Sequence, residues 1–450
     1  MWASKFLKGR NARAITKTSI TAAASAPTSQ AEFSANSQAF SVAVTELLEC
    51  LDFVLDQLDD QGKYSFPAYE LGEHGDLLQF HLSRLAKEIS KYENSKVDEQ
   101  TSQPWTGDRD LLELLLAACR CACSVYKPDV HPGGDLVPVI SRTPSITGTV
   151  KATSIWKSED TNTLFVSIRG TSCKTDHLVN FNRNQKNTTS VFVSRWSLLF
   201  LSNINSYFKA FQGTKEQIYA HSGFLACAAT LLPWLTEEIT RQVTADKSLK
   251  DVVFTGHSAG GAVAAMVFLH FVCHCPSELS NAKFSLVTFG APPITSKNVT
   301  ELTQALPQTR HIYAVVNEHD LVPRVDQGYI TSIIMLYRSA YGLPLSELNN
   351  STFANTQGDR KDIAIWELPP PDFYVVGNVI ILRSKFDSVL QSRLSHSSTD
   401  INTPAQKLDI IQMSQMQFGK LLFFEISVHK RKIYLNRLEK LVQERWGIVP

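Results

Sequence analysis

The chain has 450 residues, of which 43% are hydrophobic and 19% charged, and its formal net charge is +1. This composition excludes wholesale disorder, and the charge balance provides neither the basic field of a nucleic-acid-binding protein nor an acidic interaction tail. The longest apolar run, Ala262 to Cys275, contains two histidines and is shorter than the about 18 residues that cross a bilayer. We therefore expect one large globular domain with extensions, without nucleic-acid partner or transmembrane segment.

The first 36 residues predict a disordered or targeting tail. Residues 1–31 contain five basic and no acidic side chains and are rich in Ser, Thr and Ala, a composition typical of mitochondrial transit peptides. Gly9 and Arg10 interrupt the apolar stretch that a secretory signal needs, and the eight cysteines lack the spacing of a disulfide framework. We expect an intracellular protein with reduced thiols, cytoplasmic in the first place, with a mitochondrial location and cleavage of the tail left open.

Residues 37–149 predict a helical extension packed on the core. Apolar residues at helical intervals predict an amphipathic helix from Phe40 to Leu58 and a second, mostly buried helix from Leu111 to Tyr126. The polar stretch from Ser90 to Asp108 between them is expected to be a surface connection. Three cysteines alternate along the second helix, at positions 119, 121 and 123, so their side chains point to different faces and predict no metal site.

From about residue 150 the pattern changes to short apolar runs separated by helical segments. Ser154–Lys157 and Leu164–Ile168 flank a polar turn and predict a hairpin. Further strands are predicted at Val252–Thr255, Phe284–Phe289, His311–Val316 and Tyr374–Leu382, and a closing helix from about Lys430 to Arg445. Strands that alternate with helices predict the α/β class, with a central, mostly parallel sheet flanked by helices.

The strongest chemical signal follows the strand Val252–Thr255. The chain continues as Gly256-His257-Ser258-Ala259-Gly260-Gly261 and then as a predicted helix, the strand–turn–helix context of the nucleophile elbow in α/β hydrolases. Glycines permit the tight turn, and the helix N-terminus offers N–H groups and a favourable dipole. Ser258 is therefore the candidate nucleophile. His257 beside it should point away from the serine hydroxyl, so we assign it to packing.

Several motifs occur in the order found in the class 3 lipase family, and the chain resembles this family over roughly Val150 to Leu441. GHSAGGA is similar to the family's G-H-S-L-G-G-A, and residues 165–171 are similar to the strand ending in F-R-G-T, with isoleucine replacing phenylalanine. Weaker or shorter similarities are Asp176–Asn180 to D-W-L-x-D/N, His221–Phe224 to H-x-G-F and Val287–Pro292 to T-F-G-x-P. The resemblance implies an α/β-hydrolase fold with Thr171 and the backbone N–H of Ala259 as oxyanion-hole donors.

The same resemblance nominates the acid and the base. Asn317–Pro323 is similar to N-x-x-D-x-V-P and points to Asp320, which follows a predicted strand and should project from the same sheet edge as Ser258. Asp326 is the fallback. With the chain order Ser, Asp, His, the base is His396 or His429. His396 lies in a polar stretch, whereas His429 lies in a segment similar to the family's late H-x-x-x-x-Y-L, and we favour His429.

The function implied is that of a serine carboxylic-ester hydrolase that acts on acylglycerols or related lipids through an acyl-enzyme, without metal or organic cofactor. Residues 172–220 contain many apolar side chains, and in related lipases this region forms a lid that opens at a lipid surface; a helix packed permanently on the core is the alternative. The natural lipid and the oligomeric state stay open. Two other functions remain: a catalytically silent hydrolase-fold module that binds lipid or protein, and a soluble esterase for non-lipid substrates.

Overall fold

The computed structural model describes residues 85–98, 102–127, 130–144, 150–170, 218–326, 328–329, 332–333, 336, 365–385, 407–425 and 427–446. These residues belong to a compact unit that spans Leu47–Pro450, and the other unit, Met1–Glu46, lies outside them. Also outside are the predicted helix from Phe40 to Leu58, Thr171, the insertion up to residue 217, and His396.

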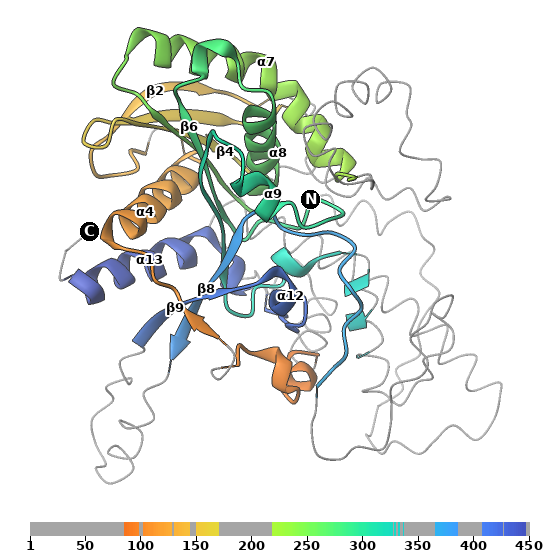
Figure 1. Cartoon of the computed structure of the whole chain (residues 1–450). Helices are drawn as coiled ribbons and strands as arrows, with labels where there is room; N and C mark the ends of the chain where they lie inside the picture. The colour runs from red at the N-terminus through yellow and green to blue at the C-terminus, as the bar shows by residue number, and fades with distance from the viewer. Residues whose placement is uncertain are drawn as a thin grey trace, which may run out of the picture. The chain divides into compact units, whose positions relative to one another are not determined.

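A nine-stranded sheet forms the centre of the described unit (Figure 1). Its strands are β1 (Gln103–Pro104), β2 (Leu136–Arg142), β3 (Thr153–Ser158), β4 (Thr163–Ile168), β5 (Asp251–His257), β6 (Lys283–Phe289), β7 (Thr309–Asn317), β8 (Asn378–Lys385) and β9 (Lys407–Met413). They lie in the order β1-β9-β8-β7-β6-β5-β4-β3-β2. Strands β4 to β8 pair in parallel, and the outer pairs are antiparallel.

Helices cover both faces of this sheet. They are α4 (Arg109–Ser124), α7 (Ser222–Ala245), α8 (Ala259–Cys273), α9 (Thr300–Gln304), α12 (Gln415–Phe418) and α13 (Arg431–Trp446), with 3-10 turns η1 (Glu93–Ser95), η2 (Ser277–Leu279), η3 (Val322–Arg324) and η5 (Ser427–His429). Helices α4 and α13 pack together on one face, and α7 and α8 pack together on the other (Figure 1). This arrangement is the α/β-hydrolase fold predicted from the sequence.

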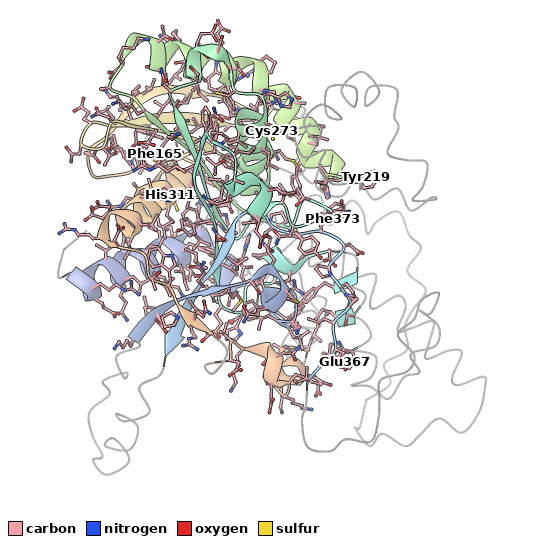
Figure 2. The ribbon with its side chains drawn as sticks, viewed as in Figure 1. Phe165, Tyr219, Cys273, His311, Glu367 and Phe373 are labelled. Carbon is pink, nitrogen blue, oxygen red and sulfur yellow. The ribbon has the colours of Figure 1, made fainter. Side chains whose placement is uncertain are left out.

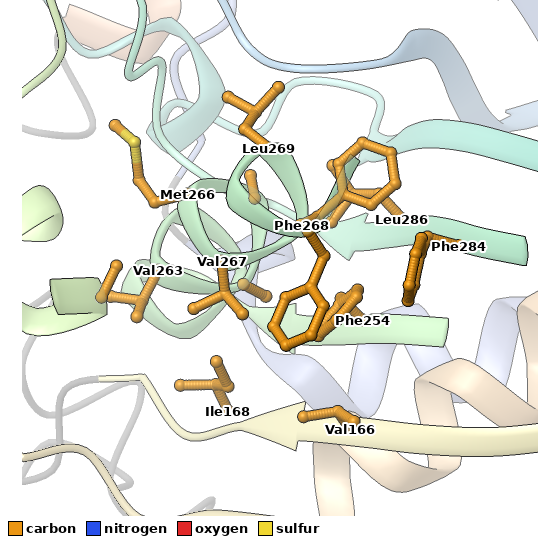
Figure 3. Packing of buried hydrophobic residues seen from close by; sticks show 14 of the residues in the cluster. Val166, Ile168, Phe254, Val263, Met266, Val267, Phe268, Leu269, Phe284 and Leu286 are labelled. Atoms are coloured by element: carbon orange, nitrogen blue, oxygen red, sulfur yellow. The ribbon is translucent and has the colours of Figure 1, made fainter. Parts of the chain in front are cut away.

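The central strands are apolar on both faces because both faces are covered. In β5, Val252 and Phe254 pack in the cluster formed with α7 and α8, while Val253 between them packs in the cluster formed with α4 and α13. Side chains from the helices and the sheet fill the space between the layers (Figure 2). On the α8 side, the ring of Phe254 lies 6.3 Å from that of Phe268 and 6.2 Å from that of Phe284 (Figure 3).

The predicted strands and the closing helix are confirmed, with shifted ends. Strand β8 begins at Asn378, because Tyr374 pairs instead with Thr295 in an isolated bridge. The prediction of a surface connection from Ser90 to Asp108 is wrong in part: Val97 and Trp105 are buried, and β1 pairs with β9. A two-residue edge strand that contains proline has no periodicity for the sequence to reveal.

The cysteines of α4 occupy a helix that is covered on more than one side. Cys119 and Cys121 are about 200° apart around the helix axis, yet both are buried, because α4 contacts the sheet and α13. Burial raises the pKa of both thiols well above the ordinary value. Within the described residues, no group of histidine, cysteine or acidic side chains is placed to hold a metal ion, and no helix is long and apolar enough to cross a bilayer.

Candidate active site

Ser258 lies at the sharp turn between β5 and α8. Its backbone has φ 57° and ψ −133°, a conformation that costs a non-glycine residue roughly 1–3 kcal/mol. A side chain at either flanking glycine would clash with the backbone. A Cβ on Gly256 would lie 2.5 Å from the carbonyl carbon of Gly260, and one on Gly260 would lie 2.2 Å from the carbonyl oxygen of Ile168. The G-x-S-x-G pattern is thus what lets the helix approach the strands so closely while presenting the serine.

The structure brings Ser258, His429 and Asp320 together. The Nε2 atom of His429 lies 2.9 Å from Oγ of Ser258, and its Nδ1 lies 2.9 and 3.1 Å from the two carboxylate oxygens of Asp320. His429 and Asp320 are almost completely buried. This network assigns the proton of the neutral ring to Nδ1, which donates to Asp320, so that Nε2 faces the serine hydroxyl as an acceptor.

The fallback acid, Asp326, has a different environment. Its carboxylate accepts the backbone N–H groups of Tyr329 at 2.7 Å and Asp372 at 3.2 Å. Burial raises the pKa of Asp326, and these contacts fix a turn of the chain beyond η3. Of the two aspartates, Asp320 is the one in hydrogen-bond contact with His429.

Asp320 has two more donors besides His429. The hydroxyl of Tyr434 donates to Oδ2 at 2.5 Å, and the backbone N–H of Val322 donates to Oδ1 at 2.9 Å. The Tyr434 oxygen in turn accepts the backbone N–H of Asn317 at 3.0 Å. Burial, and then the adjacent Asp320 charge, hold the pKa of Tyr434 well above its ordinary value, so its hydroxyl stays protonated and donates.

Gly290, at the end of β6, lies directly beside this cluster. Its φ is 57°, and a Cβ there would lie 2.9 Å from Oδ2 of Asp320, 2.9 Å from the Tyr434 hydroxyl and 3.0 Å from Cε1 of His429. No side chain fits without moving the acid or the imidazole. The glycine of the segment Thr288-Phe289-Gly290 therefore acts by making room, a role that the sequence pattern alone did not assign.

His257 contacts both the backbone and the ring of His429. Its Nε2 lies 2.6 Å from the backbone oxygen of His429, and the two rings lie 4.6 Å apart. The side chain is buried, in agreement with the predicted packing role. Asn317 adds a second restraint on the same turn, because its Nδ2 donates to the carbonyl of Val428 at 2.7 Å. The sequence placed Tyr434 and Asn317 within recognisable segments but gave no sign that they contact the acid or the histidine turn.

One predicted oxyanion donor can be placed. Ala259 is the first residue of α8, where helix geometry leaves N–H groups without intrahelical acceptors, and it directly follows Ser258. Thr171 lies outside the described residues, but Gly170 before it donates its N–H to the hydroxyl of Tyr126 at 3.0 Å. A Cβ on Gly260 would lie 2.6 Å from the Gly170 nitrogen, so the end of β4 touches the start of α8.

This arrangement can activate a hydroxyl nucleophile. A buried carboxylate orients an imidazole, the imidazole faces a serine hydroxyl, and a helix N-terminus lies behind the serine, as acyl transfer requires. No step of this chemistry depends on a metal ion or an organic cofactor.

Comparison with known proteins agrees with the sequence motifs. A family model described as Lipase (class 3) matches residues 165–329, which include Ser258 and Asp320. Over 120 residues the chain is 27% identical to the chloroplastic phospholipase A1 PLIP1 of Arabidopsis thaliana; the match covers 27% of this chain and 18% of that protein. The chain thus spans less than a fifth of the length of this relative. The resemblance to class 3 lipases is confirmed.

Solved lipase structures are also similar. Native Rhizomucor miehei lipase in its propeptide complex is 14% identical, with a TM-score of 0.42 over 77% of this chain and 91% of that chain. The Lip2 lipase of Yarrowia lipolytica is 12% identical, with a TM-score of 0.45 over 74% of this chain and 96% of that chain.

Proposed function

We propose that this chain, whose residues 165–329 match the class 3 lipase family, is a serine carboxylic-ester hydrolase that acts on acylglycerols or related lipid esters. One observation carries the proposal: a continuous row of hydrogen bonds runs from Ser258 through His429 to the buried Asp320. A silent binding module has no need to keep this row intact, nor to maintain a strained serine at the end of a strand.

In the proposed mechanism, Nε2 of His429 takes the proton of Ser258 as Oγ attacks the ester carbonyl. Asp320 stabilises the imidazolium, and the N–H of Ala259, with a second donor at Thr171 implied by the family resemblance, stabilises the oxyanion. His429 then protonates the departing alcohol, which leaves an acyl-enzyme. Water, deprotonated by His429, attacks the acyl carbonyl, and the carboxylic acid is released as the serine regains its proton.

The substrate class rests on the relatives. The matching family is one of lipases, and the curated relative is named a phospholipase A1, so a glycerolipid ester bound at a lipid surface is the best-supported substrate. A choice between neutral acylglycerol and phospholipid would depend on side chains that contact the head group. Hydrolysis of a non-lipid ester is the second candidate function, because the same three residues would hydrolyse such an ester as well.

A fluorophosphonate probe tests the proposal directly. Wild-type protein should be labelled, and Ser258→Ala should not be, while His429→Ala should lose turnover and His396→Ala should keep most of it. A folded wild type that resists the probe would favour the silent binding module. A series of esters of increasing chain length, with and without vesicles, then separates the classes, because a lipase gains activity at the vesicle surface and a soluble esterase does not.

A further inference from the structure

We propose that Asn94 is a positioning residue for the His429 base, an inference that rests on the proposed function. Asn94 lies in η1, upstream of the residues that match the lipase family. Its side chain connects two segments far away in the sequence, one of which leads to His429. The segment of residues 419–425, which runs from α12 to η5, is called the histidine loop below.

The histidine loop forms neither a helix nor a strand beyond an isolated bridge at Glu425, so its path depends on hydrogen bonds to other segments. Arg324 donates to the carbonyls of Gly419 at 2.7 Å and Leu421 at 3.2 Å. The hydroxyl of Tyr329 donates to the carbonyl of Phe423 at 2.5 Å. Both of these donors come from the region just after Asp320.

Asn94 supplies the contacts that lie between these. Its side-chain Nδ2 donates to the carbonyl of Lys420 at 2.8 Å, and its backbone carbonyl accepts the N–H of Leu422 at 2.7 Å. The same Nδ2 donates to the carbonyl of Trp366 at 2.9 Å, while Oδ1 accepts the N–H of Trp366 at 3.2 Å. Glu367, the residue after Trp366, is labelled in Figure 2 and marks the position of this segment. Both amide hydrogens and the amide oxygen of Asn94 are therefore used.

The residues after Asn94 contact the segment that carries the acid. The carbonyl of Ser95 lies 3.0 Å from Nδ1 of His319, and the N–H of Val97 donates to Oε1 of Glu318 at 3.0 Å. Glu318 and His319 immediately precede Asp320. The stretch from Asn94 to Val97 thus binds both the segment that leads to Asp320 and the segment that leads to His429. These two segments also meet directly, where the N–H of Glu425 donates to the carbonyl of His319 at 2.8 Å.

An amide is the chemical group that fits this position. An aspartate of the same size would still accept the N–H of Trp366, but it would direct a carboxylate oxygen at the carbonyls of Trp366 and Lys420. Alanine would leave both carbonyls without this donor. In either case the loop loses a restraint seven residues before η5, and displacement of the imidazole from Ser258 and Asp320 slows the chemical step more than it weakens substrate binding.

The test compares Asn94→Ala and Asn94→Asp with the wild-type full-length chain. Active sites are counted by fluorophosphonate titration. For a p-nitrophenyl ester, kcat is then expressed per titrated site and KM is measured beside it. Misfolding lowers the number of sites, whereas misplacement of His429 lowers the rate at each site. We expect kcat per site to fall by about tenfold to a hundredfold in both variants, with KM changed less than about twofold. The rate constant of phosphonylation should fall in parallel, because the probe needs the same activated serine.

Ser414→Ala is the matched control. Ser414 caps α12, where its Oγ accepts the N–H of Gln417 at 3.2 Å, so this variant destabilises the chain just before the histidine loop without touching Asn94. It should lower the melting temperature and keep wild-type kcat per site. If Asn94→Ala yields no titratable sites, the isosteric Asn94→Asp decides by the same criterion. Wild-type kcat per site in the Asn94 variants would overturn the inference, whereas an inactive, unlabelled wild type would overturn the proposed function instead.

Discussion

The hydroxyl of Tyr434 donates a 2.5 Å hydrogen bond to Oδ2 of Asp320, from a helix that begins only two residues after His429. The acid is therefore held by the same piece of chain that delivers its imidazole partner. Because the Tyr434 oxygen also accepts the N–H of Asn317, it ties the end of β7 to α13. This phenol is therefore one of the direct links between the segment that carries the acid and the segment that carries the base.

Tyr434→Phe should lower kcat about tenfold with little change in KM. The variant removes a hydrogen bond to a charged group, of a kind that contributes roughly 1.5–3 kcal/mol, and part of this loss is expected in the transition state. It also leaves the buried N–H of Asn317 without its acceptor, so unfolding by urea should show a loss of about 1–3 kcal/mol. Tyr313→Phe, on the middle of β7, is the control. Equal kcat in the two variants would contradict a role for Tyr434 in holding Asp320.

Gly290→Ala should reduce kcat per active site by more than about tenfold, because the new methyl would displace Asp320, Tyr434 or His429. Gly133→Ala separates this clash from simple backbone strain: Gly133 has φ 89°, but no atom of the described residues lies within 4 Å of the position of a Cβ. The control should lose about 1 kcal/mol of stability and no turnover per site. The measurement is active-site titration combined with initial rates; similar rates in both variants would show that crowding at Gly290 is irrelevant to the chemistry.

Asp320→Asn should lower kcat by about four orders of magnitude, since an amide cannot stabilise the imidazolium and can favour the wrong tautomer. Asp326→Asn should retain most of the rate, because the Asp326 carboxylate accepts the backbone N–H groups of Tyr329 and Asp372, whereas His429 contacts Asp320. Burst titration with a chromogenic ester, followed by the steady-state rate, measures kcat per site in the two variants. A large loss in Asp326→Asn with a small one in Asp320→Asn would reverse the assignment of the acid.

His270, on the last turn of α8, should make stability depend on pH. Burial, and then the neighbouring His274, lower the pKa of His270 from 6.5 to about 4. Between these values the unfolded chain binds a proton that the folded chain does not, so stability falls as the pH drops from about 6.5 toward 4. His270→Gln lacks this linkage. The unfolding free energy of the variant minus that of wild type, measured by urea titration, should therefore be about 2 kcal/mol larger at pH 4.5 than at pH 7.5. A difference that does not change with pH would disprove the linkage.

The fold was predictable where burial is complete. Each of the strands β4 to β7 contains a short apolar run that packs in the core, and the elbow at Ser258 combines a strand, glycines and a helix in one contiguous segment. Strand β1 was not predictable, because its two residues are defined only by their partner β9. A pairing across that distance leaves no local pattern in the sequence.

The candidate site divides in the same way. Ser258, Asp320 and His429 each lie in a short motif, so the sequence could nominate them, but only the fold distinguishes contact with Asp320 from contact with Asp326. Gly290 and Asn94 could not be assigned roles from sequence. Their importance comes from what lies opposite them in space, and those neighbours are 30 or more residues away.

The order of strands in the sheet has a consequence for synthesis. From β2 to β9 each strand lies beside the next one in the chain, so a ribosome-bound chain can add strands one at a time as they emerge. Only β1 must wait, for a partner about three hundred residues later. His429 emerges later still, after the last strand. If the proposed function is right, a nascent chain can expose its elbow long before the base that ester hydrolysis needs has been synthesised.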